Sequence, residues 1–215
     1  MSKAETLHRM IEVGIVPVVR AASSAEALQA VEAIKAGGVP VIEITMTVPG
    51  AVRVIEEVVA RYGAEVLVGA GTVLDAETAR ACMLAGAEFI VSPALNLETI
   101  AICRRYGKLV MPGALTPTEV LAAWQAGADF VKVFPCDSLG GAKYLKSLKA
   151  PLPQIQMVPT GGVSLQTAAD FIKAGASALG VGSDLVNDQT LREGLESLIT
   201  ERARRFVEII KAARQ

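Results

Sequence analysis

Residues 126–135 read Ala-Gly-Ala-Asp-Phe-Val-Lys-Val-Phe-Pro. The glycine suits the left-handed backbone position that ends a helix, and the short run after it is rich in β-branched and aromatic residues, which is typical of a strand. Similar glycine stops precede apolar runs at 36–38, 85–87 and 174–176. The segment therefore predicts a helix that leads through a tight stop into a buried strand, and the pattern recurs along the chain.

Eight such apolar runs alternate with stretches of helical period, as parallel βα units require. The runs are Val16–Arg20, Val41–Thr45, Val66–Gly69, Phe89–Ser92, Leu109–Met111, Phe130–Phe134, Gln156–Thr160 and Ala178–Gly182. Eight units predict an α/β fold, a single (β/α)8 TIM barrel that forms one domain over residues 1–215. The alternative is a doubly wound open sheet, but the chain lacks a dinucleotide-binding fingerprint.

Two further helices are expected at the ends of the chain. Ser2–Val13 predicts an extra N-terminal helix before the first strand, and Leu191–Ala213 predicts a closing helix.

The segment Met1–Arg9 lacks the apolar core of a signal peptide, and the longest apolar runs are far shorter than the roughly 18 residues that a membrane span needs. We therefore expect a cytoplasmic protein without a membrane partner.

Composition excludes several classes of protein. Hydrophobic residues make up 52% of the chain and charged residues 20%, which is too apolar for a disordered protein. Lys and Arg number 21 against 22 Asp and Glu, so no nucleic-acid partner is expected. The three cysteines, Cys82, Cys103 and Cys136, predict free thiols in a reducing compartment.

Lys132 is the first candidate catalytic residue. It lies in the middle of an apolar run, where a strand of a parallel sheet is buried on both faces. One interpretation is a lysine that extends to the rim of the barrel and binds backbone carbonyls. The other is a nucleophile, because a site of low dielectric constant favours the free amine.

Glu43 repeats the anomaly with a carboxylate in the run Val41–Thr45. Glu43 and Lys132 lie on the second and sixth runs, and residues from alternate strands of a barrel share interior layers. A purely structural ion pair is one interpretation. An amine beside a proton-transferring carboxyl is also what imine formation and carbon–carbon cleavage require.

Glycine-rich segments follow the last two runs: Pro159-Thr160-Gly161-Gly162 and Gly180-Val181-Gly182-Ser183. Each could be an ordinary tight turn. Together they match the position of the usual phosphate site of such barrels, where backbone N–H groups bind the anion. Arg20 ends the first run and Thr72 follows the third, which predicts a guanidinium and a hydroxyl at the same mouth. A solvated arginine and a helix cap are the simpler alternatives.

Metal chemistry is not expected, because a metal-dependent aldolase normally needs a histidine cluster and the chain has one histidine, His8. No cofactor is expected either. Cys136 follows the sixth run, but no neighbouring histidine supports a thiol nucleophile.

At these residues the sequence resembles the 2-keto-3-deoxy-6-phosphogluconate (KDPG) aldolase family, some members of which also act on 4-hydroxy-2-oxoglutarate (KHG). The resemblance covers nearly the whole chain and rests on five motifs. They are Gly127-x3-Val131-Lys132-Val133-Phe134-Pro135 with Gly140, Gly38-x3-Ile42-Glu43-Ile44-Thr45, Gly69-Ala70-Gly71-Thr72, Ser92-Pro93 and Pro159-Thr160-Gly161-Gly162.

The resemblance implies a (β/α)8 fold, a homotrimer and reversible cleavage of a small 2-keto acid, KDPG, to pyruvate and glyceraldehyde 3-phosphate. It assigns the imine to Lys132 and proton transfer to Glu43. It places Thr72 and Pro93 in the pyruvate pocket, with Phe134 and Thr160 as further substrate-binding residues. The phosphate is assigned to Gly161, Gly162, Gly182 and Ser183.

The chain departs from the family pattern at two positions. Thr47 stands where many members have an arginine that binds the pyruvate carboxylate. Thr47 is still expected to be a substrate-binding residue, with Arg20 as the substitute for the missing arginine. Cys136 replaces the small residue that usually follows Phe-Pro.

An aldolase for the galactonate epimer is the nearest alternative function. A phosphate-binding isomerase or synthase without a covalent lysine, and a non-catalytic scaffold, are the others.

Overall fold

The computed structural model describes residues 1–187 and 189–215, together with the helical backbone at residue 188. The strands are β1 Ile15–Val19, β2 Val41–Thr45, β3 Leu67–Gly71, β4 Phe89–Val91, β5 Leu109–Met111, β6 Gly113–Ala114, β7 Val131–Val133, β8 Met157–Pro159 and β9 Leu179–Val181. The α-helices are α1 Lys3–Val13, α2 Ser24–Ala36, α3 Ala51–Tyr62, α4 Ala76–Leu84, α5 Leu97–Arg105, α6 Pro117–Gln125, α7 Ala142–Lys149, α8 Ala168–Lys173, α9 Asp188–Arg192 and α10 Glu196–Ala213.

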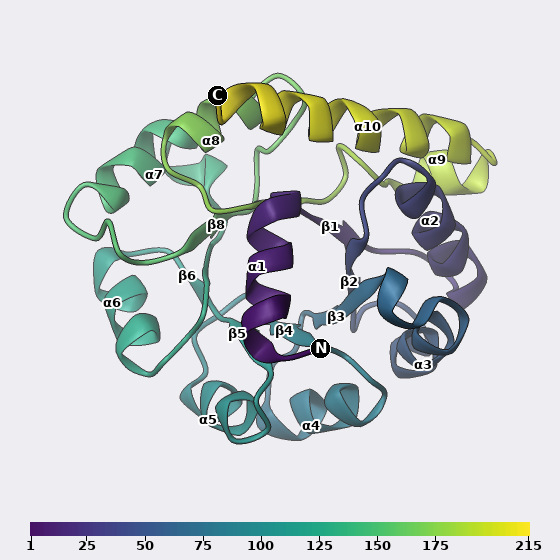
Figure 1. The fold of residues 1–215 in the computed structure, drawn as a ribbon, viewed down its shortest axis with the longest axis horizontal. Helices are drawn as coiled ribbons and strands as arrows, with labels where there is room; N and C mark the ends of the chain where they lie inside the picture. Colours follow the sequence, from purple (N-terminus) through teal and green to yellow (C-terminus); the bar gives the residue numbers. More distant parts are fainter.

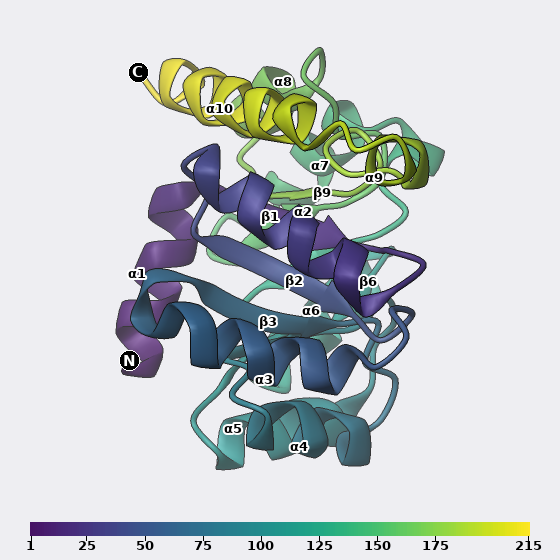
Figure 2. The same ribbon diagram turned by 90° about the vertical axis from the view of Figure 1, so that its right-hand side faces the viewer.

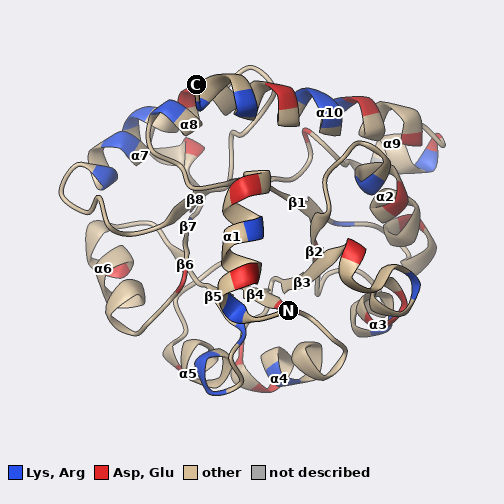
Figure 3. Cartoon of the chain, in the orientation of Figure 1, with Lys and Arg blue, Asp and Glu red and all other residues tan. Residues whose placement is uncertain are grey.

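The protein has an α/β fold with a curled parallel sheet, and the predicted alternation of strands and helices is confirmed. Six strands pair in the order β5-β4-β3-β2-β1-β9, and three more pair in the order β6-β7-β8. The helices lie outside the curled sheet, and α1 lies across one end of it (Figures 1 and 2). Charged residues gather on the outer helices and on α1, while the strands are mostly uncharged (Figure 3).

Backbone contacts join the two groups of strands on both sides. Pro112 separates β5 from β6, because proline has no N–H with which to continue the ladder. The amides of Asp129 and Phe130, just before β7, still donate to the carbonyl of Val110 in β5, at 3.1 and 3.3 Å. On the other side an isolated parallel bridge pairs Thr160 with Gly180.

The ends of the chain show one confirmed helix and one correction. Helix α1 begins after Ser2, whose side chain accepts a hydrogen bond from the amide of Glu5 in a capping box. The single closing helix expected at Leu191–Ala213 is wrong. The chain forms α9 and α10 there, and Gly194, with φ of 65°, allows the turn between them.

The core has two parts that follow the alternation of side chains along each strand. One cluster packs the strands against the outer helices. The other lies on the opposite face, which we call the inner face, and contains Val16, Val41, Leu67, Phe89 and Phe130 together with Met10 of α1 and further strand residues. Helix α1 therefore covers one end of the inner face, and the polar residues of the strands gather toward the other end.

Candidate active site

The two-residue period of the strands sets the direction of the candidate catalytic side chains. Val41 and Phe130 belong to the inner-face cluster, and Glu43 and Lys132 each follow two positions later. Ile42 and Val131, between them, belong to the cluster under the helices. Glu43 and Lys132 therefore both point to the inner face, as predicted.

Lys132 is almost fully buried, with 4% of its surface exposed. Its Nζ lies 5.3 Å from the centre of the Phe134 ring, a distance at which an ammonium is attracted to the π face. Lys132 forms none of the ion pairs found among residues 1–187 and 189–215. The Lys132 side chain is therefore enclosed by protein except for a small exposed fraction.

Glu43 is even more buried, at 2% exposed, and its Oε1 has no hydrogen-bond partner within the described part of the chain. Burial raises the pKa of the Glu43 carboxyl, while the positive charges of Lys132 and Arg20 act in the opposite direction. These electrostatic contributions show that the three charged groups share one region. A buried carboxyl whose pKa is raised is a better proton donor and acceptor in catalysis than an ordinary surface carboxylate.

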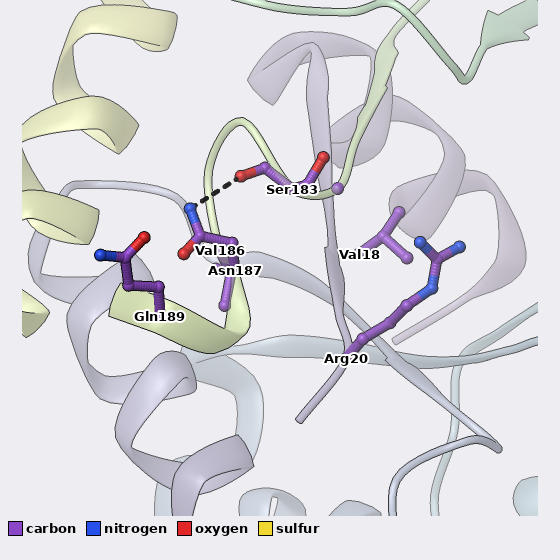
Figure 4. Close-up of a pocket in the computed structure, with 7 residues that line it drawn as sticks. Val18, Arg20, Ser183, Val186, Asn187 and Gln189 are labelled. Atoms are coloured by element: carbon purple, nitrogen blue, oxygen red, sulfur yellow. Dashed lines mark hydrogen bonds between the residues drawn. The ribbon is translucent and has the colours of Figure 1, made fainter. Parts of the chain in front are cut away.

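Two adjoining cavities open beside Arg20, the exposed residue that follows β1. The larger cavity, of about 430 Å³, is lined by Val18, Arg20, Gly182, Ser183, Val186, Asn187 and Gln189. Figure 4 shows Arg20 and the Ser183 loop around it, with the Asn187 amide donating to the Ser183 carbonyl at 3.3 Å.

The smaller cavity, of about 100 Å³, collects most of the predicted binding residues. Its lining includes Arg20, Phe134, Thr160, Gly161, Gly162, Gly182 and Ser183. Lys132 and Glu43 do not line it. Phe134 contacts Lys132 and Val18 pairs in register with Glu43, so the two buried charges lie next to residues of the cavity wall.

The glycine loops are shaped by local backbone geometry. Gly161 and Gly162 have φ of 96° and 70°, which L side chains rarely adopt. A β-carbon at Gly180 would lie 2.1 Å from the Thr160 hydroxyl oxygen, so only glycine allows this close approach. The loops after β8 and β9 therefore meet at a surface with few side chains, where an anion can approach the backbone.

Thr47, Thr72 and Pro93 do not line either cavity. The Thr47 hydroxyl lies 2.7 Å from that of Thr45, which itself donates to the Val19 carbonyl at 3.0 Å, so Thr47 has a partner already. Thr72 has a left-handed φ of 56°. Pro93 contacts the backbone of Gly113, where a β-carbon would be only 2.2 Å away.

Sequence reasoning missed two carboxylates at the glycine loops. A β-carbon on Gly161 would lie 2.7 Å from Asp137 Oδ1, and Asp184 lines the smaller cavity. Asp184 directly follows the predicted phosphate residue Ser183, so its position was a usable signal. Asp137 directly follows Cys136, at the end of the lysine motif, so its position was also a usable signal.

The three cysteines are buried thiols outside the candidate site. Cys82, Cys103 and Cys136 are free and buried, as predicted. Burial raises the pKa of Cys136 to about 11, so its thiol is not a ready nucleophile.

Among residues 1–187 and 189–215, no group of three or more His, Cys, Asp and Glu side chains could hold a metal ion. A search of the same residues finds no helix with the length and hydropathy of a membrane span.

The model of the KDPG and KHG aldolase family matches residues 7–201 of the chain. A 2-dehydro-3-deoxy-phosphogluconate aldolase from Treponema pallidum is 32% identical, over 96% of this chain and 96% of that protein. A 2-dehydro-3-deoxy-6-phosphogalactonate aldolase from Escherichia coli is 38% identical, over 80% of this chain and 83% of that protein.

A KDPG aldolase from Legionella pneumophila, solved with pyruvate captured as a covalent carbinolamine intermediate, has a similar structure. The TM-score is 0.84 and the sequences are 26% identical, with 95% of this chain and 97% of that chain covered.

Proposed function

This chain belongs to the KDPG and KHG aldolase family, and from that premise we propose that it is a class I aldolase in which Lys132 forms a Schiff base with a 2-keto acid. The observation that carries the proposal is the pair of buried, oppositely charged residues Lys132 and Glu43 on the inner face. The carbinolamine reported for the Legionella pneumophila relative supports the same chemistry here.

The proposed reaction uses both residues at defined steps. The free amine of Lys132 attacks the keto carbon, and loss of water gives the imine. Glu43 accepts the proton of the substrate hydroxyl as the adjacent carbon–carbon bond breaks, which releases an aldehyde and leaves an enamine on Lys132. The enamine carbon then takes up a proton, and water hydrolyses the imine to release pyruvate and restore the amine.

The proposed substrate is KDPG, cleaved to pyruvate and glyceraldehyde 3-phosphate, with KHG, cleaved to pyruvate and glyoxylate, as a further substrate. The cavity formed by Gly161, Gly162, Gly182 and Ser183 supports a phosphorylated substrate. The galactonate epimer is the second candidate, because the Escherichia coli relative named for it is 38% identical. Thr72 and Pro93 are proposed to shape the pyruvate pocket.

Arg20 is the proposed anion-binding residue in place of the family's arginine at Thr47. Its Nη1 would lie 3.7 Å from a β-carbon on Gly182, so its guanidinium is next to the phosphate loop. If Arg20 binds the pyruvate carboxylate, Arg20→Met should weaken the trapping of pyruvate. If it binds only the phosphate, the same change should raise KM for KDPG and leave trapping unchanged.

At the level of the whole molecule we propose one domain over residues 1–215, folded as a closed (β/α)8 barrel with an extra N-terminal helix. The Thr160–Gly180 bridge and the Asp129 hydrogen bond to Val110 support closure of the sheet. By the family resemblance we also propose a homotrimer in the cytoplasm, acting without a metal or cofactor.

Borohydride reduction in the presence of pyruvate, followed by peptide mass mapping, tests the covalent mechanism. We expect reduced pyruvate on the peptide that contains Lys132. Lys132→Ala should lose both the trapped product and the cleavage activity while keeping the circular dichroism spectrum of the folded chain. Lys173→Ala, in helix α8, is the control and should react as the wild type does. Cleavage without any trapped lysine would favour an acid–base isomerase or synthase-type site instead.

A further inference from the structure

The loop between β9 and α9 carries two exposed backbone N–H groups that are not used by the fold. Its first turn is closed by the amides of Leu185 and Val186, which both donate to the carbonyl of Gly182 at 3.0 Å. The amides of Ser183 and Asp184 find no acceptor among residues 1–187 and 189–215, and both residues are exposed. These two amides are therefore free to donate to a ligand.

The direction of each free amide is set by the carbonyl of the same peptide group. A trans peptide group is planar, so its C=O and its N–H point in opposite directions. The amide of Ser183 shares a peptide group with the Gly182 carbonyl, which the turn already holds. The amide of Asp184 shares one with the Ser183 carbonyl, which accepts a hydrogen bond from the side-chain amide of Asn187 at 3.3 Å. Asn187 therefore sets the direction of the Asp184 amide.

The side chain of Asn187 is itself held in one orientation. Its Oδ1 accepts hydrogen bonds from the amide and from the hydroxyl of Thr190, at 2.9 and 2.8 Å, and Thr190 is buried. A backbone N–H can only donate, so the oxygen of the Asn187 amide must face Thr190 and its NH₂ group must face the Ser183 carbonyl. Figure 4 shows this carbonyl directed at Asn187 and away from Arg20. The Asp184 amide then points to the Arg20 side of the loop.

We propose that Asn187 is a positioning residue for phosphate recognition, which aims the Asp184 amide at the anion through the Ser183 carbonyl. This role depends on the proposed function, because the phosphate must bind at the loops after β8 and β9. The exposed carboxylate of Asp184 opposes the anion, and the guanidinium of Arg20, next to Gly182, offsets it. Loss of the Asn187 donor should therefore weaken phosphate binding and affect the imine chemistry far less.

Asn187→Ser separates the two roles of the side chain. Serine caps a helix about as well as asparagine, so α9 keeps its cap. Its single short hydroxyl cannot bind Thr190 and the Ser183 carbonyl at the same time. Asn96→Ser is the matched control, because Asn96 caps α5 through the amide of Thr99 at 2.7 Å and lines neither cavity beside Arg20.

The test is a titration of the ¹⁵N-labelled protein with inorganic phosphate, followed through the backbone resonances of Ser183 and Asp184. In the wild type and in Asn96→Ser we expect both resonances to shift saturably with the same Kd. In Asn187→Ser the Kd should rise about 3- to 10-fold, the scale of one hydrogen bond. The shift of Asp184 should also shrink more than that of Ser183, whose peptide group the turn still holds.

Kinetics should show the same selectivity. The KM for KDPG should rise with the phosphate Kd in Asn187→Ser, whereas the KM for KHG and the borohydride trapping of pyruvate on Lys132 should change far less. An unchanged phosphate Kd in Asn187→Ser, with both amides still shifting, would overturn the role of Asn187 and leave the proposed phosphate site in place. A Kd that rises equally in Asn96→Ser would also overturn it, because any weakened helix cap would then have the same effect.

Two further outcomes separate the loop from the rest of the site. If pyruvate trapping falls as far as phosphate affinity in Asn187→Ser, the residue supports the whole site, and its specific role in phosphate binding is wrong. If phosphate shifts neither amide in the wild type, both this role and the proposed phosphate site are wrong. Trapping of pyruvate on Lys132 would still test the aldolase mechanism independently.

Discussion

The carboxyl of Glu43 occupies the space in which a side chain on Gly71 would stand. A β-carbon built on Gly71 would lie 1.8 Å from Oε1 and 2.4 Å from the carboxyl carbon of Glu43. Thr72, with its left-handed φ of 56°, follows directly. The end of β3 therefore fixes the position of the proposed proton-transfer group on β2, with which it pairs in register.

Gly71→Ala should lower turnover because the new methyl group displaces the Glu43 carboxyl. We expect a loss comparable to that of Glu43→Gln, within the roughly 10²- to 10⁴-fold range of general acid–base assistance. The double variant should be no slower than Glu43→Gln alone, since the two changes remove the same function. The measurement is the steady-state turnover of the wild type, the two single variants and the double variant. Losses that add in the double variant would contradict the shared mechanism.

Glu43→Gln should separate imine formation from proton transfer. The amide keeps the shape of the side chain but cannot accept a proton, so turnover should fall by about 10²- to 10⁴-fold. Borohydride trapping of pyruvate on Lys132 should be slower but still detectable. Turnover equal to that of the wild type would mean that Glu43 only neutralises charge.

The raised pKa of Glu43 predicts a pH-dependent contribution to stability. Because burial raises this pKa above its ordinary value of 4.5, the folded chain holds the proton more tightly than the unfolded chain. The contribution is favourable at low pH and is lost as pH rises from 4.5 through the folded value. Urea unfolding of wild type and Glu43→Gln at about pH 5 and about pH 8 should show the variant gaining stability relative to the wild type at the higher pH. If the difference in unfolding free energy between the two proteins is the same at both pH values, the pKa of Glu43 is not raised in the folded chain.

Gly162→Val should discriminate between substrates with and without a phosphate. The branched side chain would block approach to the loop, and at φ of 70° it would also meet Asp137, because a β-carbon on Gly162 would lie 2.6 Å from the Cβ of Asp137. We expect the loss in kcat/KM to be much larger for KDPG than for KHG, with part of it in kcat because remote binding energy orients the reacting carbon.

Ser183→Ala provides a check on Gly162→Val that introduces no strain. It removes one hydroxyl from the same cavity and should show the same preference at smaller magnitude. Equal losses for both substrates in both variants would mean that these loops do not bind the phosphate.

Cleavage should persist in excess EDTA, because an imine on Lys132 replaces a metal ion as the electron sink. Activity is to be measured after dialysis against the chelator, and again after addition of zinc. Activity that disappears and returns with zinc would refute the imine mechanism.

The order of strands and helices could be predicted from the sequence, because glycine stops and apolar periodicity are local properties. It also marked Lys132 and Glu43, since a charge in an apolar run is visible without a structure. It missed the break between α9 and α10, because Gly194 is compatible with either a weak helix position or a turn.

The packing of the folded chain determines which side chains of these loops come into contact. Curling of the sheet places Arg20, at the end of β1, beside Gly182 after β9, and it brings Asp137 against Gly161. It also left Thr47 outside the cavities beside Arg20, and it placed Arg202 of α10 in a cavity with Ser183. These relationships join residues distant in sequence, so no local pattern encodes them. They arise because the strands pair into a curled sheet, which brings the ends of strands that are distant in sequence next to each other.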